Sequence, residues 1–351
     1  MLCSTARLRR RCLLVLLSLV ALTLAPLGIA SPGTAAEAAY IVFSSDRNED
    51  RYQLFRMNLD GSGVTQLTSG SSNATRPAIS PDGTKIAYAS GASLWVINSD
   101  GSDAEILAST YTWVESVDWS PDGSQLVYVE SGGGNSDSKL HVIDADGTDD
   151  TVILRTPVLR NVEFGPDGNI VYGSATNASI TGKPQLWLIT ADGSVKRLLR
   201  QGDLGDFALA PDGRGIVIAQ TSWAGGGGPI GGVFYWDDIN NLSTPNYPYT
   251  TKLWAGDGAV GNPAIAADGR VLYQHDPEFW LLETTDNDIT VVNPDGSGRK
   301  KLTTGGSNDI DPDWYTGTPP PPAAPTVTIT DGPVGTITQT RPTFGFATDQ
   351  T

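Results

Sequence analysis

The sequence has very little of the chemistry on which most enzymes and metal proteins depend. Among 351 residues it has two histidines and two cysteines, and Cys3 and Cys12 both lie within the first twelve positions. A chain cleaved after that region would have no disulfide, no thiol nucleophile and no cysteine-bound zinc. The Gly-x-Ser-x-Gly, His-Glu-x-x-His and Walker A motifs are absent as well. These absences predict a protein that is not an enzyme and has no metal or cofactor.

Positive charge and long apolar runs are also scarce. The chain has 23 Lys and Arg residues against 39 Asp and Glu residues, a formal net charge of −16. A surface this acidic repels phosphate backbones, so we do not expect a nucleic-acid partner. The apolar run Leu13–Leu24 is about a dozen residues, whereas a membrane-spanning helix needs ~20.

Residues 1–36 have the pattern of a secretory signal peptide. A positive start is followed by the apolar run and then by small residues up to Ala39, with cleavage after Ala36 as one choice; the positive residues are Arg7, Arg9, Arg10 and Arg11. We therefore expect a secreted or cell-envelope protein, periplasmic or extracellular, without stable membrane insertion after cleavage. A retained anchor is the alternative.

The sequence is rich in one repeated turn. Pro-Asp-Gly recurs at residues 81–83, 121–123, 166–168 and 211–213, with a degenerate copy at 267–269. A second Asp-Gly series begins at residues 60, 100, 146, 192 and 295. Asp-Gly suits tight hairpins because glycine adopts positive φ without steric cost. Two hairpin turns in each unit of roughly 40 residues predict four antiparallel strands per unit, which is a β-propeller blade.

The two ends of the array predict the number of blades. Tyr40–Phe43 matches the second strand of a unit, so the first unit lacks its own first strand. Residues 309–315 match a first strand such as Val117-Asp118-Trp119. We therefore predict an all-β fold, a six-bladed propeller over residues 40–315, in which the C-terminal strand 309–315 joins the first blade. Such closure removes exposed edges that would otherwise invite aggregation.

The repeat resembles that of TolB-like propellers, also called WD40-like or PD40 repeats. Four segments carry the resemblance: residues 43–47, 58–63, 66–68 and 79–83. It implies the propeller fold and a binding task. TolB also has an α/β domain before its propeller, whereas only a few residues separate the predicted cleavage site from Tyr40, so we do not expect the Tol–Pal role.

The C-terminal region has a different composition. Residues 316–325 include Pro319–Pro322 and predict a stiff, Pro-rich linker. Residues 326–351 resemble the start of a bacterial Ig-like repeat but are too few for a sandwich of ~100 residues. We expect either an incomplete Ig-like segment or a fragment of a longer protein.

The histidines and acidic clusters have ordinary explanations. His141 occupies a strand position that aromatic residues hold in other units, so we expect it to pack. His275 is predicted to lie in a loop, either at the surface or in a binding site. The acidic stretches 46–50 and 144–150 lack the pattern of an EF-hand loop, and weak calcium binding stays open.

Chain direction predicts which face of the propeller binds. Connections in a four-stranded blade alternate between two faces, and the short Asp-Gly turns occupy one of them. The longer connections occupy the other and carry aromatic residues, which either pack the loops or recognise a partner. The candidate binding residues are Trp113, Trp223, Tyr247, Tyr249, His275 and Trp280. We therefore predict an exported, monomeric, non-catalytic module that binds a protein or peptide. The alternatives are carbohydrate binding and a propeller-type hydrolase or lyase.

Overall fold

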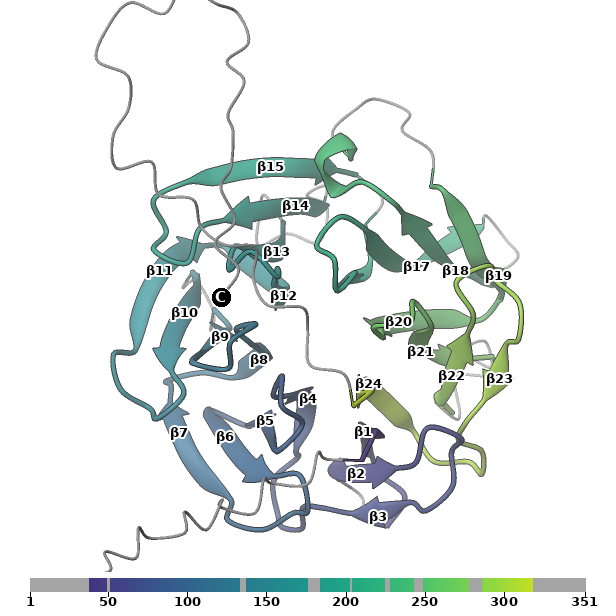
Figure 1. Ribbon diagram of the computed structural model, residues 1–351, viewed down its shortest axis with the longest axis horizontal. Coiled ribbons are helices and arrows are strands. Elements are labelled where there is room, and N and C mark those ends of the chain that lie inside the picture. The colour runs from purple at the N-terminus through teal and green to yellow at the C-terminus, as the bar shows by residue number, and fades with distance from the viewer. Residues whose placement is uncertain are drawn as a thin grey trace, which may run out of the picture. The chain divides into compact units, whose positions relative to one another are not determined.

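The computed structural model describes residues 38–48, 51–132, 137–175, 184–202, 204–224, 228–242, 249–277 and 286–317. Six four-stranded antiparallel sheets surround a central axis (Figure 1), which confirms the predicted six-bladed propeller. Within those ranges the one helix is a 3-10 turn, η1 (Ile239–Asn241), and no helix there could cross a membrane. The predicted signal peptide, most of the linker and the Ig-like segment lie outside the described residues.

Within each blade the four strands follow one another from the axis to the rim (Figure 1). Blade 1 contains β24 (Asp309–Tyr315), β1 (Tyr40–Ser45), β2 (Gln53–Met57) and β3 (Thr65–Gln66). Blade 2 contains β4 (Thr75–Ile79), β5 (Lys85–Ser90), β6 (Ser93–Asn98) and β7 (Glu105–Ser109). Blade 3 contains β8 (Val114–Trp119), β9 (Gln125–Glu130), β10 (Ser138–Asp144) and β11 (Thr151–Thr156).

Blade 4 contains β12 (Val158–Phe164), β13 (Ile170–Ala175), β14 (Pro184–Ile189) and β15 (Lys196–Gln201). Blade 5 contains β16 (Asp206–Leu209), β17 (Ile216–Ala224), β18 (Gly228–Trp236) and β19 (Thr251–Asp257). Blade 6 contains β20 (Ala259–Ile265), β21 (Val271–Asp276), β22 (Asp288–Val292) and β23 (Lys300–Lys301).

The C-terminal strand closes the ring, as predicted. β24 pairs with β1 along its length, from Tyr40 opposite Tyr315 to Ser45 opposite Asp309. The guanidinium of Arg47 donates to Asp309 Oδ1 at 2.8 Å and lies 4.9 Å from the ring centroid of Phe43. Blade 1 is therefore built from both ends of the propeller sequence.

The Asp-Gly turns are held by the side chain of their own aspartate. In the first Pro-Asp-Gly turn, Asp82 Oδ1 accepts from Ser80 Oγ at 2.7 Å and from the N–H of Thr84 at 3.0 Å. Gly83 then takes a φ of +73°, which glycine adopts at little cost. The predicted hairpins therefore form for a local reason, and they fix the strand order of each blade.

Apolar residues from facing sheets fill the spaces between blades. Blades 6 and 1, for example, bury Leu272, Ile289, Phe43 and Trp314 in one cluster. Full burial of each such side chain contributes about 1.5–3 kcal/mol relative to exposure. This packing holds the inner strands at fixed positions around the axis, where the next features lie.

Candidate functional site

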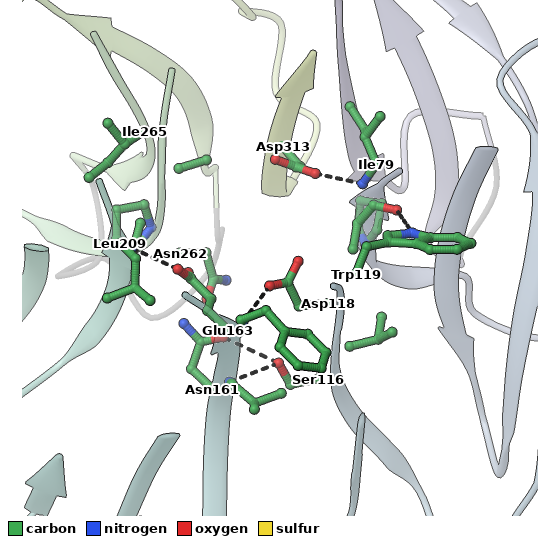
Figure 2. Close-up of a pocket in the computed structure, with 18 of the residues that line it drawn as sticks. Ile79, Ser116, Asp118, Trp119, Asn161, Glu163, Leu209, Asn262, Ile265 and Asp313 are labelled. Carbon is green, nitrogen blue, oxygen red and sulfur yellow. Dashed lines mark hydrogen bonds between the residues drawn. The ribbon is translucent and has the colours of Figure 1, made fainter. Parts of the chain in front are cut away.

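The six inner strands surround a cavity at the centre of the propeller. Its volume is about 310 Å³, and residues from β4, β8, β12, β16, β20 and β24 line it (Figure 2). Since each strand contributes the same repeat positions, the chemistry of the cavity depends on which side chain each blade places there.

Three of the inner strands bulge just before a proline. Arg76, Asn262 and Asp311 have φ values of +56°, +42° and +53°, and each precedes a proline in the sequence. The pairing register with the neighbouring strand shifts at each of these points. Such backbone costs on the order of 1–3 kcal/mol per residue, and it is retained here in residues that line the cavity.

The bulged residues bond to one another across blades. Arg76 Nη1 donates to Asn262 Oδ1 at 2.7 Å, and the N–H of Arg76 donates to Asp311 Oδ2 at 3.2 Å. The Asp311 carboxylate raises the pKa of Arg76 by direct attraction. The N–H of Asn262 donates to Asp206 Oδ2 at 3.2 Å. Polar side chains therefore link blades 5, 6, 1 and 2 at the cavity wall.

Three carboxyl groups bridge to the next inner strand in the same manner. Asp118, Glu163 and Asp313 accept, respectively, from the N–H groups of Phe164, Leu209 and Ile79, each at 2.7 Å (Figure 2). The equivalent positions in the other three blades are Ala78, Ala208 and Ala264. Acidity at this level of the cavity therefore comes from blades 1, 3 and 4.

Burial makes these carboxyl groups weak acids. It raises the pKa of Asp118 to about 7, with the Asp313 charge adding to the effect, and the pKa of Asp313 to about 6. The pKa of Glu163 lies well above its ordinary value because of burial and of the charges on Asp118 and Asp313. The cavity is therefore lined by three carboxyl groups that are weaker acids than exposed ones.

Sequence reasoning did not identify the cavity residues. Its candidates came from the long connections, and the carboxyl groups fall inside strands whose burial is invisible in one sequence. Two signals were present: an acidic residue directly before Trp119, Phe164 and Trp314, and an X-Pro pair in strands that should otherwise exclude proline.

The structure describes two of the predicted aromatic side chains at the surface. Trp113 is 67 % exposed, in the connection from β7 to β8. Tyr249, before β19, is 43 % exposed, and its ring lies 4.7 Å from that of Phe234. Trp113 is therefore open to solvent, whereas Tyr249 is partly packed.

The other predicted aromatic residues are not described as exposed side chains. Trp223 lies in β17, opposite Pro229 in β18. The predicted loop between these strands is thus largely a paired hairpin, because both strands extend to nine residues. Tyr247 and Trp280 lie outside the described residues.

The predicted loop position of His275 is wrong. It lies in β21, is 4 % exposed, and faces Asp288 of β22 in the pairing register. Its Nε2 lies 3.2 Å from the carbonyl oxygen of Asp257, and Arg299 Nη2 lies 3.1 Å from Nδ1. Burial, reinforced by the charge of Arg299, lowers its pKa. The strand continues further than predicted because these contacts satisfy a polar ring in the space between blades 5 and 6.

The connection that carries Trp113 is held tightly on both sides. The N–H of Thr110 donates to the carbonyl of Ala92 at 2.8 Å, and the N–H of Ser131 donates to the carbonyl of Trp113 at 2.8 Å. Tyr111, which the sequence reasoning did not select, is 96 % exposed on the same connection. Two exposed rings are therefore presented on a fixed backbone.

His141 packs as predicted, although it also makes polar contacts. Its ring stacks on Tyr128 at 4.4 Å between centroids, and its nitrogens lie 2.9 Å from Asp150 Oδ1 and 3.2 Å from Glu130 Oε2. Across the part of the chain that the structure describes, no three His, Cys, Asp or Glu side chains are grouped closely enough to hold a metal ion.

Comparison with known proteins agrees with the geometry. The model of the TolB beta propeller domain (PD40) matches residues 29–224, more than half of the chain. The Protein TolB homolog of Chlorobaculum tepidum is 35 % identical over 111 residues, which cover 31 % of this chain and 25 % of that protein. The crystal structure of TolB from Acinetobacter baumannii matches with a TM-score of 0.62 at 18 % identity, covering 80 % of this chain and 67 % of that one, and shows the fold alone.

Two further relatives correct one prediction. Dipeptidyl-peptidase 5 of Porphyromonas endodontalis is 29 % identical over 238 residues, 64 % of this chain and 33 % of that protein. The uncharacterized peptidase YuxL of Bacillus subtilis is 27 % identical over 194 residues, 52 % of this chain and 28 % of that protein. These relatives point, distantly, to peptidase activity, which contradicts the prediction that this protein is not an enzyme. That prediction rested on the absence of three catalytic sequence motifs. The chain spans between a quarter and a third of the three relatives' lengths.

Proposed function

Because this chain belongs to the TolB β-propeller family, we propose that it is an exported propeller that binds a protein or peptide on the face of its longer connections. The observation that carries the proposal is the fixed connection between β7 and β8, which exposes Tyr111 and Trp113. Aromatic rings on a rigid backbone lose little conformational entropy on binding and often dominate an interface.

The position of this connection supports the proposal. β7 is the outermost strand of blade 2 and β8 the innermost strand of blade 3 (Figure 1). The connection therefore runs over the propeller face from the rim towards the axis. A bound peptide chain would lie along this path, with Trp113 near the inner end.

A peptide ligand also agrees with the names of the two peptidase relatives. A propeller can supply the binding surface on which a separate catalytic site acts, so binding and cleavage need separate assays. Incubating the protein with a mixture of short peptides and following their masses would show whether bound peptides are cut.

Panning of a random peptide library displayed on phage tests the proposed binding. We expect the wild-type protein to enrich a family of related peptides, and Trp113→Ala to lose at least about tenfold of their affinity, the loss typical of an interface aromatic. Val195→Ala is the control, because Val195 is also exposed but lies in the Asp-Gly turn of blade 4.

Two results would overturn the proposal. One is the absence of enriched peptides. The other is equal binding by the wild type and by Trp113→Ala. A glycan array tests the alternative of carbohydrate binding, since exposed aromatic rings can also stack on sugars. If a glycan binds in a way that depends on Trp113 and no peptide binds, carbohydrate binding replaces the proposal.

We also propose that residues 1–36 direct export and that the mature protein is monomeric. For export, the support is the charge and apolar pattern of those residues. For the monomer, it is that the inner strands of the six sheets face the central cavity, which leaves only the outer strands at the rim for pairing with another copy. N-terminal sequencing of the protein from the envelope fraction or medium, with light scattering of that sample, would test both. An uncleaved N-terminus or a dimer would contradict them.

A further inference from the structure

We propose that Trp113 and Glu115 form a subsite for a basic side chain, arginine or lysine, of the bound peptide. The inference rests on the proposed function and names the chemistry that the site selects. Trp113 is the last residue of the connection between β7 and β8. Glu115 lies two residues later, in β8, and is exposed like Trp113. An aromatic face and a carboxylate are the two partners that a solvated cation prefers.

The neighbouring ring already shows this preference. Lys139 Nζ lies over the ring of Tyr111, 6.0 Å from its centroid. Within the described chain, no cation occupies the face of Trp113, although an indole attracts cations more strongly than a phenol does. The Trp113 ring is therefore the open member of the pair.

Local charges favour a cation as well. Lys139 is neutralised by Glu130, whose two carboxylate oxygens each accept from its ammonium at 2.9 Å. Glu115, in contrast, is exposed, and its charge reaches the cavity wall, where it helps to raise the pKa of Arg76. The chain as a whole has a net charge of −16, which favours a basic partner over an acidic one.

The rigidity of the connection turns these preferences into a subsite. Besides the two contacts described above, the N–H of Val114 donates to the carbonyl of Gly91 at 3.0 Å. Thr110 Oγ1 donates to the carbonyl of Thr112 at 2.7 Å. Because the backbone around Trp113 is bonded to blades 2 and 3, the exposed Trp113 and Glu115, which lie on either side of the buried Val114, are presented on a fixed backbone before a ligand arrives.

Fluorescence anisotropy with three labelled decapeptides tests the inference: alternating Arg-Gly, Gln-Gly and Glu-Gly. We expect the arginine peptide to bind wild-type protein at least about tenfold more tightly than the glutamine peptide, and the glutamate peptide not to bind. Trp113→Ala and Glu115→Gln should each remove most of that preference, and Glu115→Gln should also flatten the salt dependence.

Matched controls lie on β7, at the outer edge of blade 2. Glu105→Gln changes the net charge as Glu115→Gln does, and Ile106→Ala removes an apolar side chain that is 53 % exposed. We expect both to bind the arginine peptide as the wild type does. Circular dichroism of every variant would exclude a loss of fold as the cause.

The outcomes separate this inference from the proposed function. If library peptides bind through Trp113 but arginine confers no advantage, the basic subsite is wrong and the peptide-binding face stands. If Glu105→Gln weakens the arginine peptide as much as Glu115→Gln does, attraction to the whole acidic surface explains binding and the subsite is wrong. If no library peptide binds, the proposed function itself fails.

Discussion

Gly83 and Gly168 occupy the same turn position in blades 2 and 4 but have different surroundings. Their φ values are +73° and +76°. A Cβ built on Gly83 would lie 2.5 Å from Tyr315 Cε1, whereas one on Gly168 would meet nothing within 4 Å. The first glycine therefore lets the ring-closing strand approach the turn, and the second serves only the backbone.

Alanine at these two positions should separate the two roles. We expect Gly168→Ala to cost ~1 kcal/mol of unfolding free energy, the penalty of a left-handed alanine. Gly83→Ala should cost clearly more, because Tyr315 must also move. Urea denaturation of both variants measures the difference, and equal losses would mean that the Tyr315 ring relaxes freely.

Asp118 gives a prediction about pH. Its pKa is about 7 in the folded protein against an ordinary value of 3.8. The folded state thus holds the proton more tightly than the unfolded chain, so the stability linked to this group is present at low pH and is lost as the pH rises through about 7. Asn at this position stays neutral and keeps an oxygen for the N–H of Phe164.

We therefore expect Asp118→Asn to raise the thermal midpoint by a few degrees at about pH 8 and to change it little at about pH 4, close to the ordinary pKa of the carboxyl. Asp192→Asn is the opposite case, because hydrogen bonds from Thr190 and Ser194 lower the pKa of Asp192 to about 2. It should give no gain at either pH. Thermal scans that find Asp118→Asn less stable at the higher pH would contradict the buried, weakly acidic carboxyl.

At the scale of elements, strand β24 is the part whose removal should matter most. It provides Trp314 and Tyr315 to two apolar clusters, and Asp313 holds the N–H of Ile79 in blade 2. Deleting residues 309–351 should sharply lower the thermal midpoint, since the β1 edge and both clusters open to water. Deleting 318–351 should leave it nearly unchanged. Similar effects of the two truncations on circular dichroism melting curves would argue against a ring that depends on β24.

The strands could be predicted from sequence because their determinants are local. Each Asp-Gly turn is stabilised within five residues, as the bonds of Asp82 to Ser80 and Thr84 show, so a single sequence contains the whole signal. Ring closure followed from the same periodicity, since a missing first strand and an extra last one match only in a closed array.

The site was harder to predict because it depends on burial and on contacts between distant residues. Asp118 and Phe164 are 46 positions apart, and nothing in either segment states that they bond. His275 was assigned to a loop because the length of β21 depends on contacts with Arg299 and Asp257. Trp113 could be selected from the sequence as a candidate binding residue, because topology places its connection on one face. Its exposed fraction could not be predicted, because it depends on how the neighbouring residues pack.

At the scale of the whole molecule, one face of the propeller has a set of exposed negative charges. The outer Asp-Gly turns place exposed carboxylates on one face, each with a pKa lowered by hydrogen bonds from its own turn, and hence ionised at neutral pH: Asp60, Asp100, Asp146, Asp192 and Asp295. Mutual repulsion among like charges opposes the compact state and is screened by salt.

We therefore expect the thermal midpoint to rise by a few degrees between about 20 mM and about 500 mM NaCl. The double variant Asp60→Asn with Asp100→Asn should show a smaller rise, because it removes two neighbouring charges of the set. Differential scanning calorimetry measures both. A midpoint that is independent of salt, or one that falls, would show that repulsion on this face is negligible.

The split blade also decides how the propeller would respond to mechanical tension. Tyr40 and Tyr315 are paired, so the described chain enters and leaves the ring at the same end of β1 and β24. A pull between the two flanking segments acts on that antiparallel pair from its open end, and its hydrogen bonds then break one after another rather than together. The strand pair of blade 1 would therefore separate first under tension. The other five blades are each continuous in sequence, and the pulling force is not applied to them directly. If the segments before β1 and after β24 were both anchored, the pairing of these two strands would be the part of the ring with the least mechanical resistance.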